Sequence, residues 1–129
     1  MLLSFNSIEV VAPGMLPKEN RLTKKKDFER VFRRGKGLKE KFLVIKVLDN
    51  NLNVSRFGFI VSKKISKKAV LRNKIKRRLR ESVSAKLNQV RQGIDVAVIA
   101  GQGIGEKNFG EIEEISNKIL EKAGILRPS

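Results

Sequence analysis

Several residue types that usually carry chemistry are missing from this sequence. Its 129 residues include no cysteine and no histidine, which excludes disulfides, thiolate metal sites and cysteine nucleophiles. Without histidine the chain also lacks the usual near-neutral general base, so zinc hydrolases, Ser-His-Asp hydrolases and histidine-based ribonucleases are excluded. We therefore predict neither catalytic residues nor a metal site on the chain. The lack of cysteine fits a reducing compartment, and we expect a cytoplasmic protein.

Long apolar runs are missing too. The longest, residues 42–45 and 96–100, are far shorter than the roughly 20 residues of a membrane-spanning helix, so no membrane partner is expected. Residues 1–14 lack the basic start and long apolar core of a signal peptide. We expect them to be a disordered or misassigned N-terminal extension ahead of Met15. Residues 15–129 are then expected to form a single α/β domain.

Acidic residues are scarce relative to basic ones. The chain has 29 Lys and Arg against 13 Asp and Glu, a net charge of +16. A compact domain with this excess generates a long-range positive field, so its expected partners are polyanions. The charge is concentrated in two blocks: residues 63–80 contain ten basic side chains and no acid, and residues 18–41 contain eleven basic side chains and four acids.

The periodicity predicts helices and strands in alternation. A short helix is expected over 24–34, with Thr23 as N-cap, Gly35 at its end, and Phe28, Val31 and Phe32 on one stripe. Strands are expected over 42–48 and 56–62, with turn residues at 49–51 joining them as a hairpin. A further short strand is expected near residues 36–39.

The second half of the chain predicts one long helix, one strand and one final helix. Apolar residues return every fourth position across 69–90, which indicates an amphipathic helix. Residues 94–100 are almost wholly apolar and predict a strand covered on both faces. Asn108 and Glu111 have capping-box spacing at the start of a helix ending near 122. The predicted fold is α+β, a two-layer α/β sandwich of order α-β-β-(β)-α-β-α with a small mixed sheet and a long basic second helix. We expect the helices on one face of the sheet, leaving part of the other face available.

The long helix has one apolar and one cationic side. At 100° per residue, Asn73, Lys76, Arg77 and Arg80 fall opposite Leu71, Ile75 and Leu79. A solvated lysine-rich face is the ordinary alternative. The absence of acids and the high share of Arg, whose planar fork suits phosphate, favour polyanion binding instead.

Three ordered motifs resemble those of one protein family. Residues 69–80 (AVLRNKIKRRLR) resemble the signature helix of the bacterial ribonuclease P protein subunit, approximately A-x-x-R-N-x-x-K-R-x-x-R. Residues 21–32 match R-L-x-x-x-x-D-F-x-x-V-F, and residues 58–65 match G-x-x-V-S-K-K-I. The resemblance extends from about Pro17 to Leu126. Lys74 stands where the family usually has Arg, which keeps the charge but gives up a bidentate contact.

The resemblance implies a non-catalytic role in a ribonucleoprotein endoribonuclease. In that family the RNA subunit, with bound magnesium, cuts the 5′ leader from precursor tRNA. The expected partners are therefore the ribonuclease P catalytic RNA and precursor tRNA, with no obligatory protein partner. No cofactor is expected on protein side chains alone, since magnesium binds through the RNA subunit. Residues 15–129 would form an RNA-binding domain.

Two sets of contact residues follow from the resemblance and the basic blocks. The catalytic RNA is expected to contact Lys63, Lys64, Lys68, Arg72, Asn73, Lys74, Lys76, Arg77 and Arg80. The precursor leader is expected to contact Lys25, Phe28, Arg30, Phe32, Arg33 and Lys46, in a cleft between the first helix and the sheet. Core packing is the alternative for the two phenylalanines, and we expect half-exposed positions that serve both purposes. Lys46 is expected to share a strand face with Phe42 and Val44 that borders solvent or ligand.

Two other functions fit the composition. A structural RNA-binding protein of ribosomal type would have the same charge, because charge reports only polyanion binding. A sequence-specific DNA regulator is disfavoured, since its basic residues would gather on one recognition helix rather than spread over three segments. The signature helix and the Phe28/Phe32 pair favour the ribonuclease P subunit over both.

Overall fold

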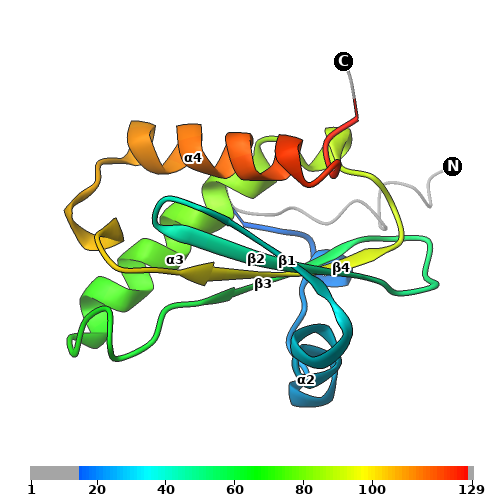
Figure 1. The fold of residues 1–129 in the computed structure, drawn as a ribbon, viewed down its shortest axis with the longest axis horizontal. Helices are drawn as coiled ribbons and strands as arrows, with labels where there is room; N and C mark the ends of the chain where they lie inside the picture. Colours follow the sequence, from blue (N-terminus) through cyan, green and yellow to red (C-terminus); the bar gives the residue numbers. More distant parts are fainter. Residues whose placement is uncertain (1–14, 128–129) are drawn as a thin grey trace, which may run out of the picture.

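The computed structural model describes residues 15–127, so the expected extension over 1–14 lies outside the described residues. The α+β class with a small mixed sheet is confirmed (Figure 1). In chain order the main elements are α2 (Lys25–Arg34), β1 (Lys36–Glu40), β2 (Leu43–Asp49), β3 (Arg56–Ile60), α3 (Ala69–Ser84), β4 (Ile94–Ala100) and α4 (Phe109–Lys122). Short 3-10 helices cover Lys18–Asn20, Leu87–Gln89 and Ile104–Glu106. Within 15–127, none of the helices has both the length and the apolar character needed to cross a bilayer.

The sheet order is β1-β2-β4-β3, and it corrects the predicted hairpin. β2 pairs antiparallel with both β1 and β4, whereas β3 pairs parallel with β4. The predicted hairpin between the strands at 42–48 and 56–62, which correspond to β2 and β3, is therefore wrong. The hairpin joins β1 to β2 instead. The turn residue Asn50 bonds to the start of β4 instead, through its N–H to the Gly93 carbonyl and its side-chain amide to Asp95. The apolar strand β4 takes a central position because only there are both its faces covered.

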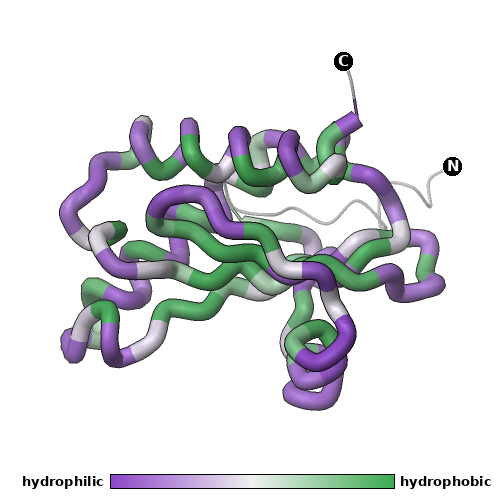
Figure 2. Tube along the Cα trace, in the orientation of Figure 1, coloured by the Kyte–Doolittle hydropathy of each residue, from purple (hydrophilic) through white to green (hydrophobic). Residues whose placement is uncertain are grey.

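Helices cover both faces of the sheet, which the two-layer expectation did not include. α3 and α4 lie on one face, over the larger core cluster that includes Ile45, Phe57 and Val96 (Figure 1). α2 lies on the other face, where Val31 packs with Leu22 and Ala97 in a second cluster. Figure 2 shows the central strands as the most hydrophobic part of the chain and the helices as amphipathic. Since α2 is short, it covers only part of its face.

The helix ends agree with the sequence at some positions and differ at others. Asn108 and Glu111 form the expected capping box of α4, with reciprocal bonds of 2.9 and 3.1 Å. Thr23 is not the N-cap of α2; Lys24 takes that position without a side-chain bond. α3 stops at Ser84 rather than near 90, because the chain turns there to bring Val90 into the core beside Leu126.

Phe42 lies in the larger core at 6% exposure, not on the face that carries Lys46. The expectation that Phe42 and Lys46 share a strand face is therefore wrong. Strand alternation fails because β2 begins only at Leu43, after a turn in which Lys41 has a φ of 49°. Val44 and Lys46 do share a face, because residues two positions apart in a strand point to the same side of the sheet.

Candidate nucleic-acid interface

The sheet face that carries α2 presents side chains in three rows across the strands. By strand register the first row is Leu48, Asp95 and Arg56; the second is Gly37, Lys46, Ala97 and Gly58; and the third is Lys39, Val44, Ile99 and Ile60. We call the third row the open row. Its three apolar members are only partly buried, and Lys39 is exposed. The open row is thus a strip of apolar sheet that the protein does not fully cover.

α2 covers the first two rows and leaves the open row beside it. Val31, fully buried at the centre of the helix, packs with Ala97 of the second row. The ring of Phe28 lies directly over Gly58, so close that a Cβ at position 58 would be 2.2 Å from its Cζ atom. Gly58 is therefore the position that lets the aromatic ring pack against the backbone of β3.

An ion-pair network holds α2 on its other side, away from the open row. Arg56 donates from Nε and Nη2 to the two carboxylate oxygens of Asp95, at 2.8 and 2.7 Å, and its Nη1 lies 3.3 Å from Asp27 of α2. The Asp95 side chain is 1% exposed. Hydrogen bonding to Asp95 raises the pKa of Arg56 above its ordinary value. The buried, bidentate contact joins Arg56 of β3 to Asp95 of β4, and the single contact with Asp27 ties α2 to this pair.

The opposite side of α2 faces the open row with Lys25, Phe28 and Phe32, which share a stripe by their helical spacing. The two rings are stacked with centroids 6.2 Å apart, and Phe32 is 37% exposed while Phe28 is half-buried. Lys46 in the second row donates from Nζ to the Phe32 carbonyl at 3.0 Å, where its charge also complements the helix C-terminus. Four of the predicted leader contacts therefore gather beside the open row.

The other two predicted leader contacts point elsewhere. Arg30 lies on the network side of α2, with its Nη2 atom 3.3 Å from the Asp27 carboxylate. Arg33 is exposed on the outer side of the helix. Arg30 and Arg33 lie five and eight positions after Lys25, and the helical repeat turns their side chains to other sides of α2. Neither side chain therefore points toward the open row as the stripe residues do.

A second basic surface combines α3 with the loop before it. Ile75, Leu79 and Val83 fix the buried side of α3, as their spacing of four predicts. The predicted contacts Asn73, Lys74 and Arg77 are exposed, and so are Lys63, Lys64 and Lys68 in the loop. Arg72 joins the two parts, since its Nη1 atom donates to the Ser66 carbonyl at 2.9 Å.

Lys76 and Arg80, also predicted contacts, line a small pocket between α3 and the edge strand β3. The pocket has a volume of about 160 Å³, and Arg21 and Thr23 line its opposite wall. Arg80 Nε is buried there without a hydrogen-bond partner among the described residues. Three cations around such a small space suit a single phosphate group. Arg21 was not among the predicted site residues, although it opens the motif at 21–32.

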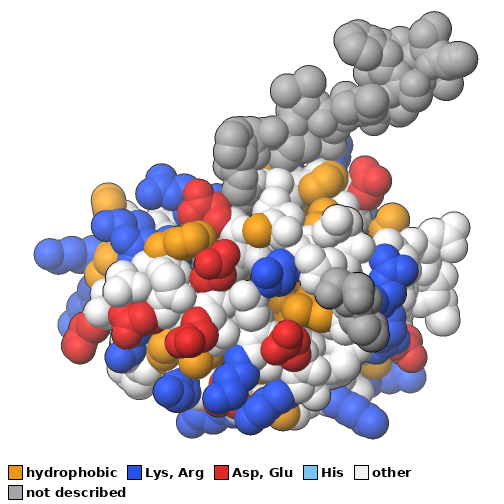
Figure 3. Space-filling model, turned by 90° about the horizontal axis from the view of Figure 1, so that it is seen from above, with side chains coloured by type: hydrophobic (Ala, Val, Ile, Leu, Met, Phe, Trp, Pro, Cys, Tyr) orange, Lys and Arg blue, Asp and Glu red, His pale blue; other side chains and the backbone are white. Residues whose placement is uncertain are grey.

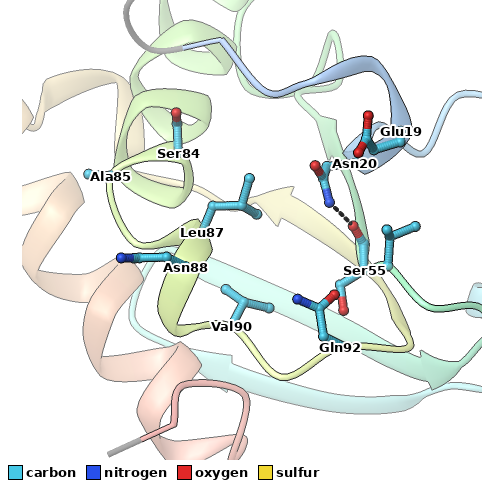
Figure 4. A pocket seen from close by; sticks show the side chains of 10 residues that line it. Glu19, Asn20, Ser55, Ser84, Ala85, Leu87, Asn88, Val90 and Gln92 are labelled. Atoms are coloured by element: carbon cyan, nitrogen blue, oxygen red, sulfur yellow. Dashed lines mark hydrogen bonds between the residues drawn. The ribbon is translucent and has the colours of Figure 1, made fainter. Parts of the chain in front are cut away.

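The remaining surface has a different character. Figure 3 shows the α4 side, where acidic and basic side chains are interspersed, and α4 itself contributes four of the acids: Glu111, Glu113, Glu114 and Glu121. A cavity of about 520 Å³ near the end of α3 has no Lys or Arg in its lining (Figure 4). Its walls include Ser84, Asn88 and Gln92 and a bond from Asn20 to the Ser55 carbonyl. Neither region belongs to the basic surfaces.

These features define a small basic α+β domain with two cationic surfaces of the kind that bind polyanions. Comparison with known proteins gives the family. The family model for Ribonuclease P matches residues 16–124. The ribonuclease P protein component of Clostridium botulinum strain 657 is 41% identical over 109 residues, covering 84% of this chain and 97% of its own. The ribonuclease P protein component of Syntrophomonas wolfei is 40% identical over 111 residues, covering 86% of this chain and 92% of its own.

Solved structures agree with the sequence comparisons. The Staphylococcus aureus RNase P protein matches with a TM-score of 0.78 and 30% identity, covering 84% of this chain and 98% of that one. The Thermotoga maritima RNase P protein matches with a TM-score of 0.73 and 30% identity, covering 79% of this chain and 96% of that one. The chain therefore belongs to the ribonuclease P protein family, the protein components of a ribonucleoprotein endoribonuclease of tRNA processing. This confirms the resemblance drawn from the three motifs over the ribosomal alternative.

Proposed function

We propose that the protein binds the catalytic RNA of ribonuclease P and the 5′ leader of precursor tRNA, and so assists magnesium-dependent endonucleolytic removal of the leader. The observation that carries the proposal is the aromatic and cationic stripe of α2 beside the uncovered open row. Single-stranded RNA is bound by this combination, because bases stack on aromatic rings while cations follow the backbone.

The leader would lie along the stripe and across the strands. Phe32, whose side chain is 37% exposed, offers a stacking surface, and Val44 and Ile99 of the open row offer an apolar floor. Lys25 and Lys46 stand at this surface to contact phosphates. At the β3 edge the leader would meet the pocket of Arg21, Lys76 and Arg80. There one phosphate would accept a hydrogen bond from the unpartnered Nε atom of Arg80.

The catalytic RNA would contact the exposed side of α3 and the loop before it. Seven of the nine predicted contacts, all except Lys76 and Arg80, lie on this surface. Arginine forks and lysine ammonium groups bind phosphates without reading base sequence, which suits a folded RNA recognised by its shape. Lys76 and Arg80 lie between the two surfaces, so they would stand where catalytic RNA and leader meet.

We assign the chemistry to the RNA subunit. The sequence has no histidine or cysteine, and the two acids where α2 meets the sheet, Asp27 of α2 and Asp95 of β4, are engaged with Arg56. Mg²⁺ is usually held by one or two carboxylates together with phosphate oxygens, and in the described part of the chain no group of three or more acidic side chains is placed to hold a metal ion. We place the ion on the RNA, whose phosphates can supply those oxygens, as the family resemblance implies.

Replacing Phe32 with leucine is expected to weaken binding of precursor tRNA by the holoenzyme by about 1–3 kcal/mol, the usual value of one stacked base. Stability should change little, since the ring is 37% exposed. Mature tRNA has no leader, so its affinity should stay at the wild-type value. Equilibrium binding of both RNAs measures the ratio of affinities. A wild-type ratio in this variant, with or without a loss of thermal stability, would place the leader elsewhere.

Replacing Arg77 with alanine is expected to weaken assembly with the catalytic RNA by about 1–3 kcal/mol, through loss of charge-assisted phosphate contacts. The fold should be spared because the side chain is exposed. Binding to the RNA subunit at fixed salt, with circular dichroism as the folding check, measures this. Arg127→Ala is the matched control, since it removes the same charge from the C-terminal segment. Equal affinities of the two variants would show that α3 presents only a solvated face.

A further inference from the structure

A cavity of about 480 Å³ opens at the β1 edge of the sheet, between the end of α2, the β1–β2 hairpin and the end of α4. Its apolar floor is formed by the half-buried Leu38 and Val47 on the α4 face of the sheet, and Leu48, also in its lining, belongs to the face that carries α2. The cations in its lining are Arg34, Lys36, Arg91 and Lys122, against one acid, Asp49. A cavity of this size with an apolar floor and a few polar groups is typical of sites for small organic groups.

Two of the four cations are already paired, and two are not. Arg91 lies 3.5 Å from the Asp49 carboxylate, and Lys122 donates to Glu40 at 2.6 Å. Within residues 15–127 the side chains of Arg34 and Lys36 have neither an acidic nor a hydrogen-bond partner. The cavity therefore combines an apolar floor with two uncompensated positive charges, which suits a base attached to a phosphate.

The cavity is continuous with the surface beside α2 through Gly37. This glycine lines the cavity and also belongs to the second row, where it pairs with Lys46. Because it has no side chain, nothing at position 37 stands between Lys46 and the cavity. Lys39 of the open row follows two residues further along the same edge strand. Cations thus mark a path from the open row, over the edge of the sheet, into the cavity.

We propose that this cavity binds a nucleotide of the precursor leader upstream of those held beside α2, with its base on the apolar floor and its phosphate between Arg34 and Lys36. The inference rests on the proposed leader site. The four strands of the sheet span three spacings of about 4.8 Å, or about 14 Å, which a stacked strand at about 3.4 Å per nucleotide crosses in about four nucleotides. The cavity therefore takes a nucleotide beyond roughly the fourth one on the sheet.

The test compares precursor tRNAs with leaders of about four and about ten nucleotides, a pair chosen from that span. With wild-type holoenzyme, the longer leader should bind about tenfold more tightly, as expected for one added charge-assisted contact. The Arg34→Ala/Lys36→Ala variant should lose this gain and keep its affinity for the short leader. The matched control, Lys86→Ala/Arg127→Ala, removes the same charges outside the cavity and should keep the gain.

The outcomes separate this inference from the proposed function. If the long leader gives no gain with the wild-type protein, or if the Arg34→Ala/Lys36→Ala variant keeps the gain, the cavity does not bind the leader. If both double variants lose the gain equally, the effect is one of net charge and the inference is wrong. The proposed function fails instead if the short-leader precursor binds no more tightly than mature tRNA.

Discussion

Replacing Arg56 with alanine is expected to lower the free energy of unfolding by about 3–5 kcal/mol, the usual cost of removing one partner of a buried ion pair. The cost arises because the Asp95 carboxylate, 1% exposed, loses two charge-assisted bonds and cannot be solvated in exchange. The tie to Asp27 is lost as well, so α2 should loosen on the sheet. Urea denaturation at neutral pH measures the change.

Arg91→Ala is the matched control for that experiment. Its ion pair with Asp49 is exposed on both sides and has a 3.5 Å separation, so its loss should cost no more than about 1 kcal/mol. Adding Asp95→Asn to Arg56→Ala should recover part of the lost stability, because the unpaired charge is then removed. Similar small losses for Arg56→Ala and Arg91→Ala would mean that the network does not hold α2 in place.

Replacing Gly58 with alanine is expected to cost about 1–3 kcal/mol of stability, as overpacking usually does. The new Cβ would lie 2.2 Å from Phe28 Cζ and 3.0 Å from the Leu22 carbonyl oxygen, so the ring must move. Because that ring seats α2 on the sheet, the stripe beside the open row should shift with it. Affinity of the holoenzyme for precursor tRNA should fall, while its affinity for mature tRNA should not.

A double-mutant cycle identifies the cause. In a Phe28→Ala background the clash with the ring is absent, so Gly58→Ala should cost clearly less than it does in the wild-type protein. Gly105→Ala is the control, since a Cβ there meets no atom within 4 Å. Equal costs of Gly58→Ala in both backgrounds would show that the Phe28 ring does not set the position of α2.

Local signals in the sequence predicted several elements well. β4 was predicted at its observed bounds because six of its seven residues are apolar, a run that is too short for a buried helix and typical of a strand covered on both faces. The capping box of α4 was predicted because it depends on residues three positions apart. The partner of β3 could not be found in this way, since period-two alternation identifies a face but not a neighbour. Asn50 was rightly assigned to a turn, yet its bonds to Gly93 and Asp95 are long-range.

At the candidate site, too, the residues with local signals were predicted and the long-range contacts were not. The motif at 21–32 placed Phe28 and Phe32 among the candidate contacts, and its charge within an apolar strand placed Lys46 there; the structure gathers all three beside the open row. The pairing of Arg30 with Asp27 depends on which side of α2 meets the sheet, and that follows from the docking of the helix on the second face. The pocket of Arg21 and Arg80 joins residues far apart in the chain, so no local pattern could predict it.

The division of roles between protein and RNA is tested most directly by one cleavage assay on precursor tRNA. The rate is measured at low and at high magnesium with the catalytic RNA alone, the protein alone, and both together. The protein alone should cut nothing, and it should increase cleavage by the RNA chiefly when magnesium is scarce, since its charge of +16 can then replace counterions. Robust cleavage by the RNA-free protein, with contaminating nuclease excluded, or an unchanged rate on adding the protein at low magnesium, would contradict these roles.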